Sequence, residues 1–179
     1  HLYYGTQTRQ YRTNYVVSSS KVKNISVRMV TGTFPLDTPA NNLLWKNALT
    51  EACNHWSSIS RCNVNMRFVE SSTADITMLG GSDSNNTVLA WAGFPYSNGS
   101  PFKNVTLNTR FSVPGSGYPN LNSLSHSQKV FLLVHELGHC LGFRHSNWSA
   151  LGEREGSNGS MLIPGTPQTD NSSVMNGAT

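Results

Sequence analysis

Residues 135–145 read HELGHCLGFRH, in which the fixed positions are His-Glu-x-x-His-x-x-Gly-x-x-His. Residues four apart lie above one another on a helix, so His135 and His139 direct their imidazole rings to one point. Gly142 can adopt a positive φ and end the helix, which lets His145 turn back as a third ligand. Three neutral imidazoles leave a fourth tetrahedral position open to water, so the pattern predicts a catalytic zinc site.

Glu136 completes the chemistry that this pattern predicts. Its carboxylate can reach a water on the metal without ligating the metal, and we therefore assign it as the general base. The alternative is a helix that carries ordinary core or surface histidines. Ser125 and Gln128 have the spacing of a capping box and independently predict a helix from about His126 to Leu141, which favours the metal site.

Hydrophobic periodicity predicts one more helix and several strands around the motif. Apolar residues recur at helical spacing over residues 40–56. Alternating or short apolar runs, bounded by Gly, Pro and Asn, predict five strands at residues 21–31, 63–71, 74–79, 87–93 and 104–111. Residues 1–20 and 146–179 show no sustained period.

Composition limits the class of protein. A chain of 179 residues with 37% hydrophobic and 12% charged residues suits one domain with a core, and is neither disordered nor a coiled coil. No wholly apolar run exceeds the length of residues 130–134, so no membrane association is expected. The net charge is +4, and five of the thirteen basic residues fall within the first 28. A nucleic-acid-binding arm is one interpretation, but no binding-module motif follows, so we expect no nucleic-acid partner.

The cysteines and the first residue suggest an exported protein. Cys53 and Cys62 bracket a span that a disulfide can close in an oxidising compartment. Cys140 is expected to be a buried thiol, with a partner in a segment outside the chain as the alternative. The sequence begins at His1 rather than Met. We therefore expect a mature product of a zymogen, from which a leader and a pro-segment have been removed.

The chain resembles the metzincin peptidases, whose zinc signature is the same His-Glu-x-x-His-x-x-Gly-x-x-His pattern and whose second hallmark is a methionine turn beneath the metal. Ser173-Val174-Met175-Asn176 looks like that turn, with Met161 as the alternative. Residues 163–167 are similar to secreted bacterial metzincins of the astacin-like, myroilysin type.

The resemblance implies an α+β fold in a single catalytic domain over residues 1–179. Its upper lobe would span about 1–142, with a twisted five-stranded sheet and two long helices above the cleft. An irregular lower lobe would span about 143–179. The family implies one catalytic Zn²⁺ and a substrate that lies antiparallel along an edge strand. The residues then expected to bind substrate are Val88, Leu89, Ala90, Trp91 and Ala92 at that edge, with Leu162 and Ile163 in the wall of an apolar S1′ pocket.

Several departures leave the subfamily open. Ser146 follows the third histidine, as in matrixins, where astacins have Glu. No Tyr follows Met175, so the tyrosine ligand of astacins and serralysins has no counterpart there. Asp occurs at only four scattered positions, 37, 75, 83 and 170, so calcium is not supported. The sequence also ends four residues after Met175, where the family usually continues into a helix.

These observations predict a secreted, monomeric zinc endopeptidase that acts on protein or peptide substrates. The alternative is a non-hydrolytic zinc-binding module or adhesin on the same fold, against which the presence of Glu136 argues. Seven Asn-x-Ser/Thr triplets permit a eukaryotic glycosylated origin. A glycan at Asn147 would crowd the cleft and one at Asn104 would crowd the substrate edge, so a bacterial extracellular enzyme is favoured. The triplets begin at Asn24, Asn85, Asn98, Asn104, Asn147, Asn158 and Asn171.

Overall fold

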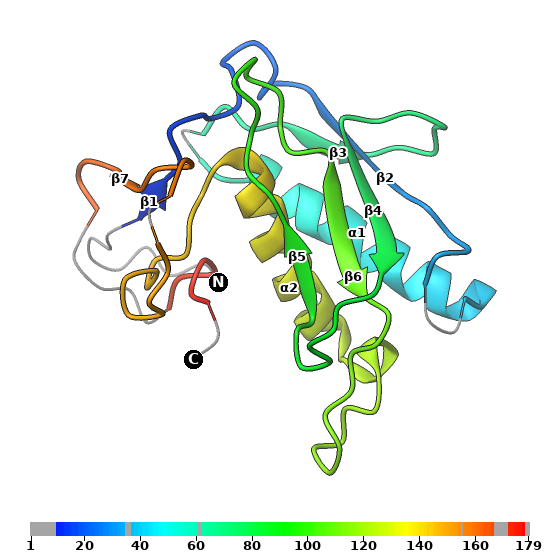
Figure 1. The fold of residues 1–179 in the computed structure, drawn as a ribbon. Coiled ribbons are helices and arrows are strands. Elements are labelled where there is room, and N and C mark those ends of the chain that lie inside the picture. Colours follow the sequence, from blue (N-terminus) through cyan, green and yellow to red (C-terminus); the bar gives the residue numbers. More distant parts are fainter. Residues whose placement is uncertain (1–9, 35–36, 61, 155, 167–171, 178–179) are drawn as a thin grey trace.

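A five-stranded sheet organises most of the chain in the computed structural model, which describes residues 10–34, 37–60, 62–154, 156–166 and 172–177. The strand order is β3-β2-β4-β6-β5. The first four run parallel, and β5 lies antiparallel to β6 at the edge (Figure 1). The strands are β2 (Ile25–Met29), β3 (Met66–Phe68), β4 (Ile76–Gly81), β5 (Ala90–Ala92) and β6 (Asn104–Asn108).

Two long helices, α1 (Pro39–Ser57) and α2 (His126–Leu141), pack side by side behind the sheet as drawn in Figure 1. Helix α1 begins after Thr38, whose hydroxyl accepts a hydrogen bond from the Asn41 N–H at 3.2 Å, and Pro39 suits the first turn that follows. A short 3₁₀ turn, η1 (Leu121–Ser123), precedes α2. The predicted α+β fold, with a five-stranded sheet and two long helices, is confirmed.

The core lies between the sheet and the two helices. Alternate residues of the central strands point toward the helices, because side chains alternate across a strand. Those of β2, β4 and β6 are at most 1% exposed: Ile25, Val27, Ile76, Met78, Val105 and Leu107. They pack in one cluster with Leu133 and Leu137 of α2. Burying one such side chain contributes about 1.5–3 kcal/mol, so this cluster holds α2 firmly in place.

A second, two-stranded sheet pairs a segment ahead of β2 with a segment after α2, and no pattern in the sequence predicts it. Strand β1 (Tyr11–Arg12) pairs antiparallel with β7 (Met161–Leu162). Next to it, the Thr13 N–H donates to Gly142 O at 2.9 Å, directly at the end of α2. Two-residue strands are too short to show a period, which is why residues 1–20 seemed featureless.

The predicted Cys53–Cys62 disulfide is wrong, because both residues are free cysteines. Cys53 faces the core from α1 and is 0% exposed, whereas Cys62 is exposed. Burial raises the pKa of the Cys53 thiol to about 12, so this thiol stays protonated near neutral pH in the folded chain. Cys140 is also free and buried, as expected.

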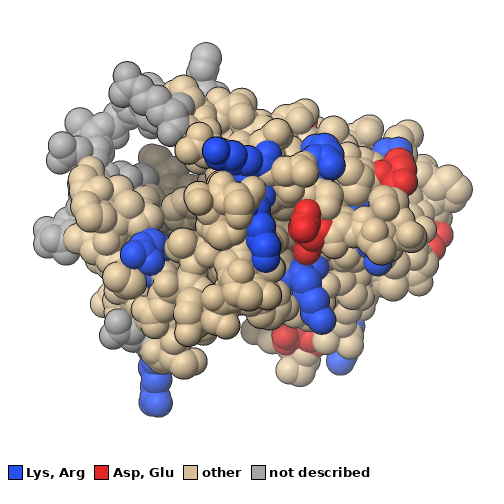
Figure 2. All heavy atoms as spheres, turned by 90° about the horizontal axis from the view of Figure 1, so that it is seen from above, with Lys and Arg blue, Asp and Glu red and all other residues tan. Residues whose placement is uncertain are grey.

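Two features of the structure bear on membrane and nucleic-acid partners, namely membrane-spanning helices and concentrated basic surfaces. No helix among the described residues has the length and apolar character needed to cross a membrane. Figure 2 shows Lys and Arg side chains scattered among uncharged ones on the face seen from above. The basic side chains seen on this face are therefore not gathered into one patch.

Candidate metal centre

Helix α2 carries the first two histidines of the motif, and local chemistry fixes both of its ends. At its start, the Gln128 N–H donates to Ser125 Oγ (3.2 Å) and the Ser125 N–H donates to Gln128 Oε1 (2.8 Å). At its end, Gly142 takes a φ of 109°, a conformation that would strain any other residue. The chain therefore turns back at once, and His145 comes to face the other two rings.

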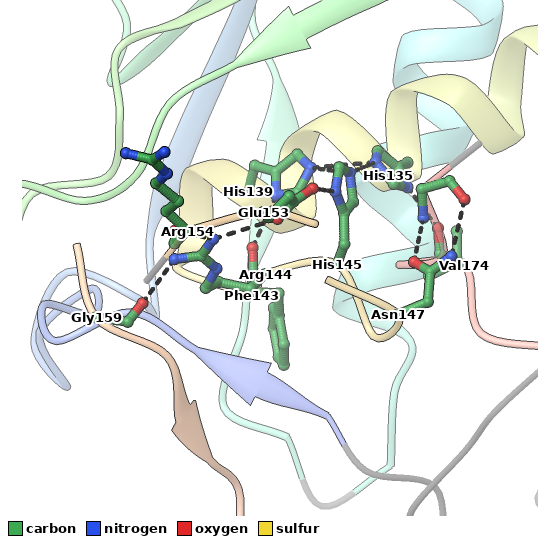
Figure 3. A network of polar contacts seen from close by, with 11 residues as sticks. His135, His139, Phe143, Arg144, His145, Asn147, Glu153, Arg154, Gly159 and Val174 are labelled. Carbon is green, nitrogen blue, oxygen red and sulfur yellow. Dashed lines mark hydrogen bonds and ion pairs between the residues drawn. The ribbon is translucent and has the colours of Figure 1, made fainter. Parts of the chain in front are cut away.

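The Nε2 atoms of His135, His139 and His145 converge on one point (Figure 3). The distance between them is 3.1 Å for His135 and His139, 3.1 Å for His135 and His145, and 3.2 Å for His139 and His145. Nitrogen ligands of a tetrahedral zinc ion, each about 2.0–2.1 Å from the metal, are about 3.3–3.4 Å apart. The observed spacing fits one such ion.

The outer nitrogens of the rings decide their protonation. Each Nδ1 faces an oxygen that can only accept a hydrogen bond, so each Nδ1 carries the proton and each Nε2 is an acceptor. Three acceptors that face one another have no hydrogen bond to make, so the arrangement suits a cation. The Nδ1 partners are Val174 O for His135 (2.6 Å), Phe143 O for His139 (2.8 Å) and the Glu153 carboxylate for His145.

Burial keeps the two helical histidines uncharged. Burial, with a contribution from repulsion by the other two rings, lowers the pKa of His139 to about 3. Burial also lowers the pKa of His135. Neutral rings keep the Nε2 lone pair that a metal ligand needs.

Glu136 lies beside the three rings in a nearly dry position. It is 5% exposed, and burial raises the pKa of its carboxyl group to about 8. Its Oε2 atom has no hydrogen-bond partner among the described residues. A buried carboxyl oxygen without a partner is costly, which indicates that a bound water or substrate is its natural partner. A carboxylate placed in this way can accept a proton from a water and return it.

Met175 packs against α2 next to the histidine motif. It is 2% exposed, and a Cβ atom at Gly138 of α2 would lie only 2.5 Å from its Sδ. Its carbonyl oxygen accepts from the N–H of Ser146, the residue after His145, at 2.8 Å. Met161, the alternative for this place, is 43% exposed in β7. The segment that carries Met175 therefore contacts both α2 and the chain just after His145.

Arg144 and Glu153, which the sequence analysis missed, support His145 from behind (Figure 3). One carboxylate oxygen of Glu153 accepts from His145 Nδ1, and the other accepts from Arg144 Nη2 at 3.2 Å. The Arg144 side chain is buried, 5.8 Å from the Phe94 ring and 5.4 Å from the Trp148 ring. Arg144 occupies a variable position of the motif, and no spacing rule marks Glu153 as the partner of a histidine eight residues earlier.

An apolar cavity of about 830 Å³ adjoins His135, Glu136 and His145. Its apolar walls are Leu89, Leu124, Phe131, Leu132 and Leu151. Leu162 and Ile163 were expected here, and this expectation is corrected. Leu162 pairs with Tyr11 in the two-stranded sheet, and the Ile163 N–H donates to Gln10 O at 2.9 Å. Leu151, in the loop after the motif, forms the wall instead.

A second cavity of about 390 Å³ lies toward His139 and the far end of β5. Strand β5 pairs with β6 on one side only, so its other edge has no partner strand among the described residues. Val88 and Leu89 lead into β5, which consists of Ala90, Trp91 and Ala92. Leu89 lines the first cavity, and Trp91 and Ala92 line the second. The expected substrate edge therefore passes both cavities.

Comparison with known proteins places the chain in a family. A family model described as "Dual-action HEIGH metallo-peptidase" matches residues 3–179. Two solved structures of myroilysin are similar to the chain, with 22% and 20% sequence identity and TM-scores of 0.40 and 0.39. The matches cover 73% and 68% of this chain and 54% and 43% of those chains, so the chain spans about half the length of these structures. No curated protein matches it significantly.

Proposed function

The chain belongs to the family of dual-action HEIGH metallo-peptidases, and on that premise we propose that it is a secreted zinc endopeptidase of protein or peptide substrates. The observation that carries this proposal is the convergence of three Nε2 acceptors beside a buried carboxylate oxygen without a partner. A site of this composition suits hydrolysis, because it offers three neutral ligands and a proton acceptor together.

Each residue of the site has one role in this proposal. His135, His139 and His145 hold the zinc ion, and Met175 supports them from below. Zinc bound there would supply Lewis-acid chemistry, which polarises the peptide carbonyl and lowers the pKa of a water. Glu136 accepts the proton from the attacking water and returns it to the leaving nitrogen.

The substrate would add to the sheet as a strand along the free edge of β5. Because β5 would run antiparallel to it, residues before the scissile bond lie near Trp91 and Ala92, and residues after it lie near Leu89. The residue after the scissile bond (P1′) then enters the apolar cavity between Leu132 and Leu151. We propose a preference for bulky apolar side chains at P1′.

Residues 1–179 would form one catalytic domain with a cleft between two lobes. Residues 10–14 hydrogen-bond to the chain after α2, so we assign them to the lower lobe rather than to the upper one. We also propose that the enzyme is monomeric, is exported from a bacterium and has lost a pro-segment. The composition supports export, and the crowding that glycans would cause at Asn104 and Asn147 supports a bacterial origin.

Zinc content and casein cleavage, measured on the wild type and on Glu136→Ala, test this function. We expect one zinc ion per chain in both proteins, chelator-sensitive cleavage by the wild type, and a loss of about 10²–10⁴-fold in the variant. Mass spectrometry of the products should show bulky apolar P1′ residues. A wild type that binds zinc and cleaves nothing would favour the non-hydrolytic zinc-binding module instead.

A further inference from the structure

The second cavity contains a positive charge that the proposed reaction does not use. Its charged lining residues are Glu136, Arg144, Glu153 and Arg154. Glu136 has its role as the base, and Glu153 pairs with both Arg144 and His145. Arg154 is exposed, and its guanidinium makes no ion pair among the described residues. Among the described residues, Arg154 is therefore the one charged group of this cavity with neither an ion-pair partner nor a role in the proposed reaction.

The backbone that carries this cation is held in place. Arg144 Nη2 donates to Arg154 O at 3.2 Å, and Arg144 Nη1 donates to Gly159 O at 2.9 Å. The buried guanidinium of Arg144, next to His145, thus holds the carbonyl groups of Arg154 and Gly159. Figure 3 shows the Arg154 side chain extending away from Arg144. A fixed backbone lowers the entropic cost of using the side chain for recognition.

The substrate position that reaches Arg154 follows from strand geometry. Both cavities are lined by Glu136, His145 and Glu153, so they adjoin each other, and we infer that they face the same side of a substrate strand. Side chains on one side of a strand are two residues apart. If P1′ enters the apolar cavity, the next side chain on that side toward the substrate's N-terminus is P2, the second residue before the scissile bond.

We propose that Arg154 is a specificity-determining residue that selects substrates with Asp or Glu at P2. This inference rests on the proposed function, because it uses the same cleft and the same substrate direction. A guanidinium presents paired N–H donors that match a carboxylate. Because the pair is partly exposed, we expect a modest preference, roughly 3- to 10-fold in kcat/KM for Asp over Lys, which salt weakens.

The test uses zinc-loaded protein and peptides that share Leu at P1′ and differ only at P2, which is Asp, Asn or Lys. The ratio of kcat/KM values between peptides is measured for the wild type, Arg154→Gln and Arg154→Glu. Lys23→Gln is the matched control, since it removes one exposed positive charge ahead of β2, a strand that β4 and β6 separate from β5 in the sheet. The same peptides are also tested for binding to Glu136→Ala by fluorescence anisotropy.

The expected order is Asp, then Asn, then Lys for the wild type and for Lys23→Gln. Arg154→Gln should remove the order, and Arg154→Glu should invert it. Cleavage of all three peptides at equal rates, or an Asp preference that survives in Arg154→Gln, overturns the inference while the proposed function stands. If no peptide is cleaved, the proposed function fails. An Arg154-dependent Asp preference in binding would still support the inference, and equal binding would overturn it.

Discussion

Replacement of Glu153 tests how the third histidine is held. The Nδ1 atoms of His135 and His139 bond to backbone carbonyls, which no substitution removes, so His145 alone depends on a side chain. Loss of such a partner typically costs about 10- to 100-fold in metal affinity. Glu153→Gln keeps an oxygen that can accept from one neighbour, so we expect about a 10-fold loss. Glu153→Ala removes both acceptor oxygens and leaves the buried Arg144 without this partner, so we expect a loss of about 100-fold in zinc affinity.

Competition with a chromogenic chelator measures this zinc affinity, and thermal unfolding of the metal-free proteins measures the fold separately. Glu51→Gln is the matched control. Glu51 accepts from His126 at 2.7 Å, an exposed carboxylate–histidine pair away from the three metal-binding rings. The control should bind zinc like the wild type. Zinc affinity of Glu153→Ala equal to that of the wild type would refute the proposed support of His145.

Two further predictions concern the helix and the base. Gly138→Ala should lower the free energy of unfolding by about 1–3 kcal/mol, because its Cβ would meet Met175 Sδ at 2.5 Å; an unchanged melting temperature would contradict the packing. In metal-free protein, burial holds the pKa of Glu136 at about 8, above its ordinary 4.5. The unfolded chain then releases this proton first, so stability falls as pH rises from about 4.5 to about 8. Glu136→Gln should gain stability over the wild type across that range in denaturant titrations, and a constant difference would refute this.

Much of the architecture could be predicted because its signals are local. The capping box at Ser125 and the glycine at 142 set both ends of α2, and hydrophobic alternation located all five strands of the main sheet. The family match confirms the metallopeptidase that the motif predicts. Each of these features depends on residues that are close together in the sequence.

The features that escaped prediction depend on contacts between distant segments. Glu153 reaches His145 from the following loop, to which Arg144 also donates hydrogen bonds at Glu153 and Arg154, and no sequence spacing encodes these contacts. The cysteine error has a simpler cause. Spacing allowed a Cys53–Cys62 bridge, but Leu49 and Trp56 lie on the buried face of α1 four residues before and three residues after Cys53, which turns that thiol into the core.

The part of the chain after α2 completes the metal centre yet has little core of its own. Val174 and Glu153 supply outer partners for two of the three rings, and Met175 is the only buried apolar side chain beyond residue 143 among those described. Hydrogen bonds from residues 10–14 hold this part to the end of α2. His145 belongs to it, whereas His135 and His139 belong to the well-packed helix. An ion held by all three histidines would therefore link the weakly packed part to the core. Metal binding would then make the residues that line the cleft after α2 more ordered.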